Sequence, residues 1–191
     1  MGKEYTEINP KLQTWIEQQH MFFVSTAPLA ADGLLNCSPK GLDSLRVLGP
    51  HRMAYLDIGG SGIETVAHLK ENGRIVIMMC AFSGPPKIYR FYGQGSVTEP
   101  QDDGFDEMLG TLPSLPAARN IIVIEVERII DSCGYGVPLY DFQKDRDSLE
   151  NYYGSKTEQE VSAYRRERNS SSLDGLPGLN TPGQQLTPES T

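Results

Sequence analysis

Positive charge is scarce in this sequence. The 191 residues include 17 lysines and arginines against 25 aspartates and glutamates, which gives a formal net charge of −8 at pH 7. Nucleic acids and anionic membrane surfaces are bound through a basic footprint, so the charge balance argues against both as partners. If the protein binds an anion, its few cations must be concentrated locally, and the placement of lysine and arginine becomes informative.

Cysteines and long apolar runs are also few. Cys37, Cys80 and Cys133 are an odd number, lie far apart and include no Cys-x-x-Cys pair. This spacing excludes a disulfide framework and a structural zinc site from the expectations, so no metal site is predicted. No run reaches the about 18 apolar residues that a membrane-spanning helix needs, and the first residues lack the apolar stretch of a signal peptide. We therefore expect a cytoplasmic protein.

Strand patterns dominate the first two thirds of the chain. Bulky apolar runs, among them 21–27, 52–58, 88–98 and 121–130, predict about six strands. The near-continuous apolar run 74–82 predicts a strand that is buried on both faces. Helices are predicted at 10–19, 64–71 and 103–109. Many antiparallel strands at short spacing, with one helix inserted, predict a mainly β fold of the barrel type with flanking helices.

The last third of the chain has a different composition. Residues 147–168 are helical and charged in pattern, and the chain after Asn169 is rich in Ser, Gly, Pro, Gln and Thr. Such a polar segment cannot bury enough apolar surface to offset the entropy of ordering it. We therefore expect residues from about 180 onward to be disordered.

Three short segments carry the main functional signal. They are Ser-Pro-Lys-Gly at 38–41, Gly-Gly-Ser-Gly-Ile-Glu-Thr at 59–65, and the segment 84–93, which runs from Gly-Pro-Pro-Lys into a strand. A Gly/Ser-rich turn that opens a helix presents free backbone N–H groups suited to a phosphate, and a basic side chain from a neighbouring strand supplies counter-charge. The alternative is a helix cap made by Ser61 or Gly62, with Glu64 favourable in the first turn. The pattern predicts a site for a phosphorylated cofactor.

In this order the three segments resemble the pyridoxamine-phosphate-oxidase-like family, the FMN-binding split barrels. The resemblance is greatest to a branch that shares both glycine-containing motifs and a tail like Ser-Cys-Gly-Tyr-Gly-Val-Pro at 132–138. It implies a six-stranded antiparallel split β-barrel at 1–131 that forms a homodimer, with two FMN sites at the subunit interface. Residues 132–179 then form a branch-specific extension packed on the barrel, followed by a disordered tail at 180–191.

The resemblance also implies which residues hold the FMN. Lys40, in the same motif as Ser38, takes the position of the basic residue that the family places near the phosphate. The positions that wrap the ribityl phosphate correspond to Ser61, Gly62, Glu64 and Thr65.

A second basic contact is expected from the strand that flanks the flavin in this family. Lys87 and Arg90 lie at its start. Residues three apart on a strand point to opposite sides, so only one of the two faces the site, and Arg90 is favoured.

Two differences from the family limit which of its cofactor and substrate contacts can be expected in this chain. The best-known oxidases have Arg and Lys near the start of the helix where this chain has Glu64 and Thr65, so the charge balance depends on Lys40, Lys87 and Arg90. Those oxidases also grip the substrate phosphate with Arg and His near the C-terminus, and 164–169 is basic without a histidine. Oxidation of vitamin B6 is therefore not predicted.

The resulting functional hypothesis is a flavin-dependent oxidoreductase with FMN as cofactor. A nicotinamide nucleotide or another small molecule is the expected reaction partner, and no catalytic side chain is assigned because the flavin carries the redox chemistry. Two alternatives stay open at this point. One is a module that stores or senses FMN without turnover, and the other is a barrel that has lost flavin and acts as a dimeric interaction protein.

Overall fold

The computed structural model describes residues 2–115 and 117–180. The strands are β1 (Glu4–Tyr5), β2 (Phe22–Thr26), β3 (Asn36–Lys40), β4 (Leu45–Gly49), β5 (Arg52–Ile58), β6 (Arg74–Cys80), β7 (Ile88–Thr98) and β8 (Ala118–Ser132). The helices are α1 (Pro10–Glu17), α2 (Glu64–Asn72), α3 (Phe105–Leu109), α4 (Ser148–Gly154) and α5 (Glu158–Arg168).

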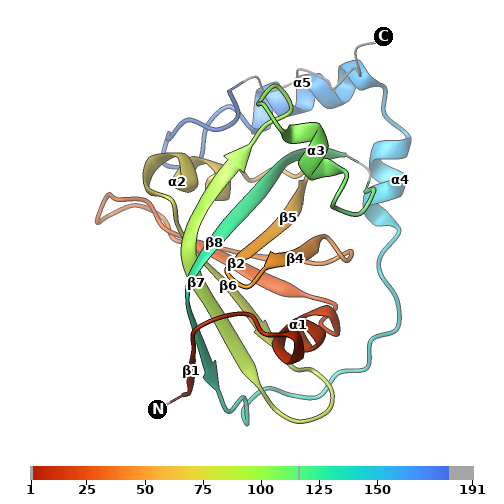
Figure 1. The fold of residues 1–191 in the computed structure, drawn as a ribbon. Helices are drawn as coiled ribbons and strands as arrows, with labels where there is room; N and C mark the ends of the chain where they lie inside the picture. Colours follow the sequence, from red (N-terminus) through yellow and green to blue (C-terminus); the bar gives the residue numbers. More distant parts are fainter. Residues whose placement is uncertain (1, 116, 181–191) are drawn as a thin grey trace.

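The strands form one antiparallel sheet that curls into a split barrel (Figure 1). Its order is β3-β2-β6-β7-β8-β5-β4, and β1 pairs with β8. The predicted fold class is confirmed, but the described residues contain eight strands rather than six. The additions are small, because β1 has two residues and β4 pairs only with β5, with a register shift between Val47 and Gly49.

The barrel interior is filled by every second side chain of the central strands. Val24, Ile77, Phe91 and Ile124 are all fully buried there. In β6 the burial alternates, with Ile75, Ile77 and Met79 inside and Val76 and Met78 partly exposed. The prediction that this strand is buried on both faces is therefore wrong. A β-sheet that covers one core can show a continuous apolar sequence when its outer face is only partly solvated.

The helix that follows β5 positions the functional site. Helix α2 begins at Glu64, directly after the glycine-rich turn, and ends at Asn72. Gly73 follows it with a φ of 70°, the left-handed conformation expected for a glycine at that place. Val66, Ala67 and Leu69 are buried against the barrel. The start of α2 is therefore held firmly next to the ends of β3 and β5.

The chain beyond β8 packs on the barrel of the same molecule. Helices α4 and α5 lie at the end of the barrel where α2 begins (Figure 1). Arg165 is buried and donates to the backbone oxygen of Ala118 at 2.9 Å, and Leu179 joins the barrel core. Of the predicted disordered tail, only Asn180 is described, and 181–191 lie outside the described residues. The boundary between 131 and 132 stays a proposal.

Two further expectations concern cysteines and membranes. All three cysteines are free thiols; Cys80 is buried, whereas Cys37 and Cys133 are exposed. Within 2–115 and 117–180, none of the helices has both the length and the apolar character needed to span a bilayer.

Candidate functional site

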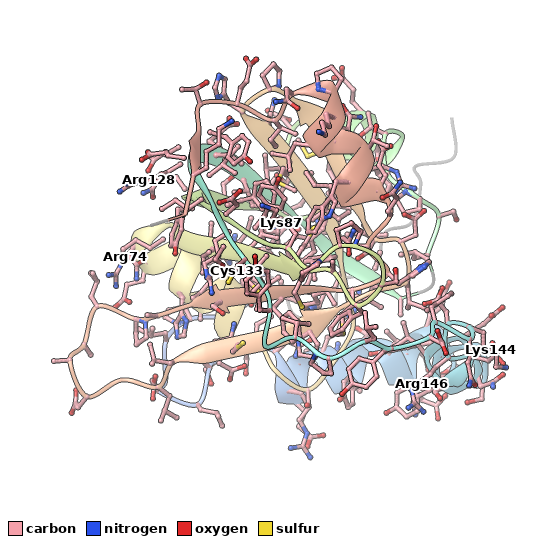
Figure 2. The ribbon with its side chains drawn as sticks, turned by 90° about the horizontal axis from the view of Figure 1, so that it is seen from below. Arg74, Lys87, Arg128, Cys133, Lys144 and Arg146 are labelled. Atoms are coloured by element: carbon pink, nitrogen blue, oxygen red, sulfur yellow. The ribbon has the colours of Figure 1, made fainter. Side chains whose placement is uncertain are left out.

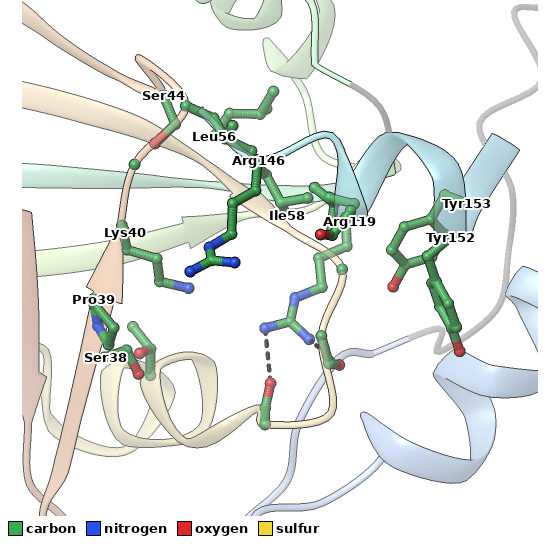
Figure 3. Close-up of a pocket in the computed structure, with 18 of the residues that line it drawn as sticks. Ser38, Pro39, Lys40, Ser44, Leu56, Ile58, Arg119, Arg146, Tyr152 and Tyr153 are labelled. Atoms are coloured by element: carbon green, nitrogen blue, oxygen red, sulfur yellow. Dashed lines mark hydrogen bonds between the residues drawn. The ribbon is translucent and has the colours of Figure 1, made fainter. Parts of the chain in front are cut away.

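A cavity of about 860 Å³ lies between the barrel and the C-terminal helices. One wall comes from β3 with Ser38 and Lys40, and a second from the start of α2 with Thr65. The third wall comes from the C-terminal extension, which contributes the side chains of Arg146, Tyr152 and Tyr153 (Figure 3). Tyr164 of α5 also lines the cavity. The cavity is thus polar and cationic near β3 and α2, and aromatic near α4 and α5.

A buried carboxylate organises the cations of the cavity. Asp57, near the end of β5, is completely buried and accepts from Lys40 Nζ at 2.8 Å and from Arg119 Nε at 2.8 Å. Asn120 also donates to this carboxylate, at 3.3 Å. Burial by itself would raise the pKa of Asp57, but the charges of Arg119 and Lys40 outweigh it and hold that pKa well below its usual range. Asp57 is therefore ionised at neutral pH.

These three side chains carry one excess positive charge. Arg119 is nearly inaccessible, with 4% of its side chain exposed, whereas the Lys40 side chain is 22% exposed and borders the cavity. One carboxylate cannot neutralise two cations, and electrostatic interactions are stronger in a partly buried site than in water. Of these two cations, the accessible Lys40 ammonium is consequently the one that an anion can reach.

Arg119 also shapes the glycine-rich turn. Its guanidinium donates to the backbone oxygen of Gly62 at 2.8 Å and to that of Gly60 at 3.2 Å. Asn169, from the C-terminal extension, donates to the Gly60 oxygen at 3.0 Å and accepts from Arg119 at 3.0 Å. Because the carbonyl groups of the turn are bound on this side, the turn is fixed between the barrel and the extension.

The N-terminus of α2 carries no side-chain cap. Its N-cap residue is Ile63, whose side chain has no polar atom to bind the first-turn N–H groups. The alternative interpretation, in which Ser61 or Gly62 caps the helix, is therefore wrong. Glu64 also leaves these groups free, since its carboxylate accepts from the backbone N–H of Leu173 at 3.3 Å. Uncapped N–H groups at a helix start favour an anion.

A hydrogen-bonded network fixes the hydroxyl groups at the cavity floor. Asn36 donates to Thr65 at 2.9 Å and to Thr26 at 3.1 Å, and it accepts from Ser38 at 2.9 Å. The buried His68 bonds Thr26 through Nδ1 at 2.9 Å, and burial lowers the pKa of this imidazole. The network orients Ser38 and Thr65, whose hydroxyls can contact a ligand.

The structure brings five of the eight predicted residues together. The cavity is lined by Ser38, Lys40, Gly62, Glu64 and Thr65. Ser61, between two lining glycines, is exposed and does not line the cavity.

Lys87 and Arg90 lie elsewhere. Lys87 pairs with Asp131 at 2.9 Å, and Arg90 donates to Ser132 at 3.1 Å. Figure 2 shows Lys87 beside Cys133 and well separated from Arg146. Flavin contacts by Lys87 and Arg90 stay predictions, and within one chain they would require a place other than this cavity.

Sequence reasoning missed Asp57, Arg119, Asn169 and Arg146. The sequence does point to Asp57, because a lone aspartate at the end of the apolar strand 52–58 needs a cation nearby if it is buried. Arg119 lies two residues before the apolar run 121–124, and is therefore a candidate partner. No local pattern distinguishes Asn169 or Arg146, which meet the barrel only through the path of the extension.

Replacing Asn169 with alanine tests whether the extension stabilises the turn. Asn169 is fully buried, and its loss leaves Arg119 and the Gly60 oxygen each without one partner. We expect the free energy of unfolding to fall by about 1–3 kcal/mol in urea denaturation. The matched control is Asn151→Ala on the exposed face of α4, which should change stability by no more than about 0.5 kcal/mol. Equal effects of the two substitutions would contradict the role of Asn169.

Comparison with known proteins identifies the family. No family model matches the chain. A pyridoxamine 5'-phosphate oxidase family protein of Aspergillus flavus, ustO, is 39% identical over 195 residues, which cover 93% of this chain and 78% of that protein. Crystal structures of HupZ from Group A Streptococcus share the fold, with a TM-score of 0.51, 22% identity, and 66% of this chain and 94% of HupZ covered in one of them. The chain belongs to the pyridoxamine 5'-phosphate oxidase family.

Proposed function

We propose that the cavity binds a flavin nucleotide, specifically FMN, and that the protein is a flavin-dependent oxidoreductase acting on a small molecule. One observation carries the proposal: the accessible Lys40 ammonium shares the single carboxylate of Asp57 with Arg119, next to the uncapped start of α2. Both features favour a ligand with a phosphate group. Family membership is consistent with a flavin as that ligand.

The residues of the cavity fit both ends of FMN. Lys40, the hydroxyls of Ser38 and Thr65, and the first N–H groups of α2 would hold the phosphate. Tyr152 and Tyr153 offer aromatic surface to a planar ring. Burial raises the pKa of Tyr153, which keeps this phenol uncharged at neutral pH. When bound, FMN would supply the electron transfer, and the protein would bind, orient and shield it.

The partners of the reaction are also proposals. A nicotinamide nucleotide is proposed as electron donor, with an unidentified small molecule as the other substrate. A homodimer is proposed as the functional unit, on the family resemblance. Gel filtration of a flavin-loaded sample tests it, because elution of the flavin with a monomer would contradict the proposed dimer.

Titration with FMN tests the cofactor. We expect absorbance in the flavin region in the purified protein, or quenching of flavin fluorescence when FMN is added to colourless protein. A preparation that takes up no FMN in excess would refute the proposed cofactor.

A reduction assay separates catalysis from storage. Without oxygen, NADPH or NADH should bleach the flavin of an oxidoreductase, and the colour should return in air. Flavin that is bound but not bleached by either donor would favour a binding module.

A further inference from the structure

Arg146 is an unpaired cation at the mouth of the cavity. It belongs to the connection between β8 and α4 and lines the cavity beside Lys40. Figure 3 shows its guanidinium directed into the cavity, between the Lys40 ammonium and Arg119. Within 2–115 and 117–180, it forms no ion pair or hydrogen bond, and the adjacent Asp145 forms none with it. Three cations therefore converge on a region whose buried carboxylate, Asp57, already serves two of them.

The position of Arg146 is set by contacts on both sides of it. Upstream, the backbone N–H of Tyr140 donates to the Phe82 oxygen at 2.9 Å, and the rings of Phe142 and His20 stack at 3.7 Å between centroids. Downstream, α4 begins at Ser148 and buries Tyr153. The segment is therefore attached to the barrel before Arg146 and packed against it after Arg146, which keeps the guanidinium near the cavity.

The neighbouring Lys144 differs in a way that gives a comparison. Lys144 pairs with Asp147 at 3.0 Å, is largely exposed and does not line the cavity. Both cations come from the same short segment (Figure 2), so they contribute similarly to the long-range potential. They differ in that only Arg146 can touch a ligand inside the cavity.

The charge of a phosphate monoester explains why two accessible cations are useful. Such a group carries about −1.5 to −2 at pH 7. Asp57, Lys40 and Arg119 together supply one excess positive charge, and the carboxylate of Glu64, which also lines the cavity, accepts from the backbone N–H of Leu173. Arg146 supplies the second positive charge, on a planar group that can donate two parallel hydrogen bonds to phosphate oxygens.

We propose that Lys40 and Arg146 together clamp a phosphate dianion, so that the C-terminal extension makes the cavity selective for phosphorylated ligands. The inference rests on the proposed function only in naming the phosphorylated ligand as a flavin. It assigns to the extension a direct role in binding, beyond packing on the barrel.

The test compares Arg146→Gln with Lys144→Gln, which removes the same charge two residues away. Dissociation constants for FMN and for riboflavin, which lacks the phosphate, are measured by flavin fluorescence. Arg146→Gln should weaken FMN binding about tenfold, or about 1.4 kcal/mol, and leave riboflavin binding within about twofold. Lys144→Gln should change neither constant by more than about twofold, because an exposed charge outside the cavity is screened by salt. Arg146→Lys should recover part of the lost affinity.

A second probe separates this inference from the flavin proposal. Inorganic phosphate, added at constant ionic strength, should raise the melting temperature of the wild type and of Lys144→Gln more than that of Arg146→Gln. If this difference appears and FMN does not bind, the clamp stands and the flavin proposal falls. The clamp is refuted if Arg146→Gln binds FMN like the wild type, or loses FMN and riboflavin affinity equally. It is also refuted if the wild type responds to neither FMN nor phosphate.

Discussion

Replacing Asp57 with alanine is expected to lower the free energy of unfolding by about 3–5 kcal/mol. Asp57 is completely buried and is the carboxylate partner of the nearly inaccessible Arg119 and of Lys40. Its removal leaves the Arg119 charge buried without a counter-ion, which costs far more than the loss of a surface ion pair. Urea denaturation of the variant and the wild type, at pH 7 and in the absence of added ligand, measures the difference.

The control is the exposed ion pair between Asp43 and Arg46, where 77% of the aspartate side chain is accessible. Asp43→Asn should change stability by about 0.5 kcal/mol or less, because exposed pairs contribute little and asparagine tolerates the left-handed backbone at this position, where φ is 53°. If Asp57→Ala proved as mild as Asp43→Asn, Asp57 could not be the organising charge of the site.

The depressed pKa of Asp57 also sets a pH dependence. A carboxyl group with a lower pKa in the folded state stabilises the protein fully above its ordinary pKa of about 4. That contribution is lost as the pH falls below this value and through the lowered pKa of the folded state. The wild type should therefore lose more stability than Asp57→Ala between pH 6 and acid pH, as measured by urea midpoints. Parallel curves for the two proteins would refute the assignment of this pH dependence to Asp57.

The second large effect is expected at Lys40, where Lys40→Gln should weaken FMN binding at least tenfold, or about 1.4 kcal/mol. Glutamine removes the excess positive charge and leaves the Arg119–Asp57 pair in place. Glutamate would lower the affinity as well, but it would place a second carboxylate against the buried Asp57 and lower stability. Lys40→Gln therefore separates binding from folding more cleanly.

The matched control for Lys40→Gln is Lys11→Gln, which removes an exposed lysine from α1. Both variants should retain a cooperative unfolding transition, and only Lys40→Gln should lose FMN affinity by fluorescence titration. Unchanged FMN affinity in Lys40→Gln would remove Lys40 from the phosphate site.

Much of the fold was predictable because its signals are local. Strand β7 has the predicted bounds, and α2 begins at the predicted residue and ends one residue later than predicted. The number of strands was not predictable, because the two residues of β1 form a strand only by pairing with β8. Burial of β6 was also misjudged, since an apolar sequence does not say which face a neighbouring layer covers.

Part of the lining of the cavity was predictable from the sequence. Two contiguous motifs, 38–41 and 59–65, contain Ser38, Lys40, Gly62 and Thr65, which do line one cavity. The sequence analysis also predicted a site contact from Lys87 or Arg90, because the strand that flanks the flavin in this family is expected to contribute a cation. In the structure each has a different polar partner, Asp131 for Lys87 and Ser132 for Arg90.

The sequence alone determined the class of the barrel and the glycine-rich turn before α2, because these depend on periodicity and turn chemistry. Only the tertiary structure decided that Asp57 meets Arg119 across 62 positions and that Arg146 reaches the same cavity from the extension. The physical reason is that a buried charge is balanced by whichever group the packing brings near. Distance along the chain does not predict that partner.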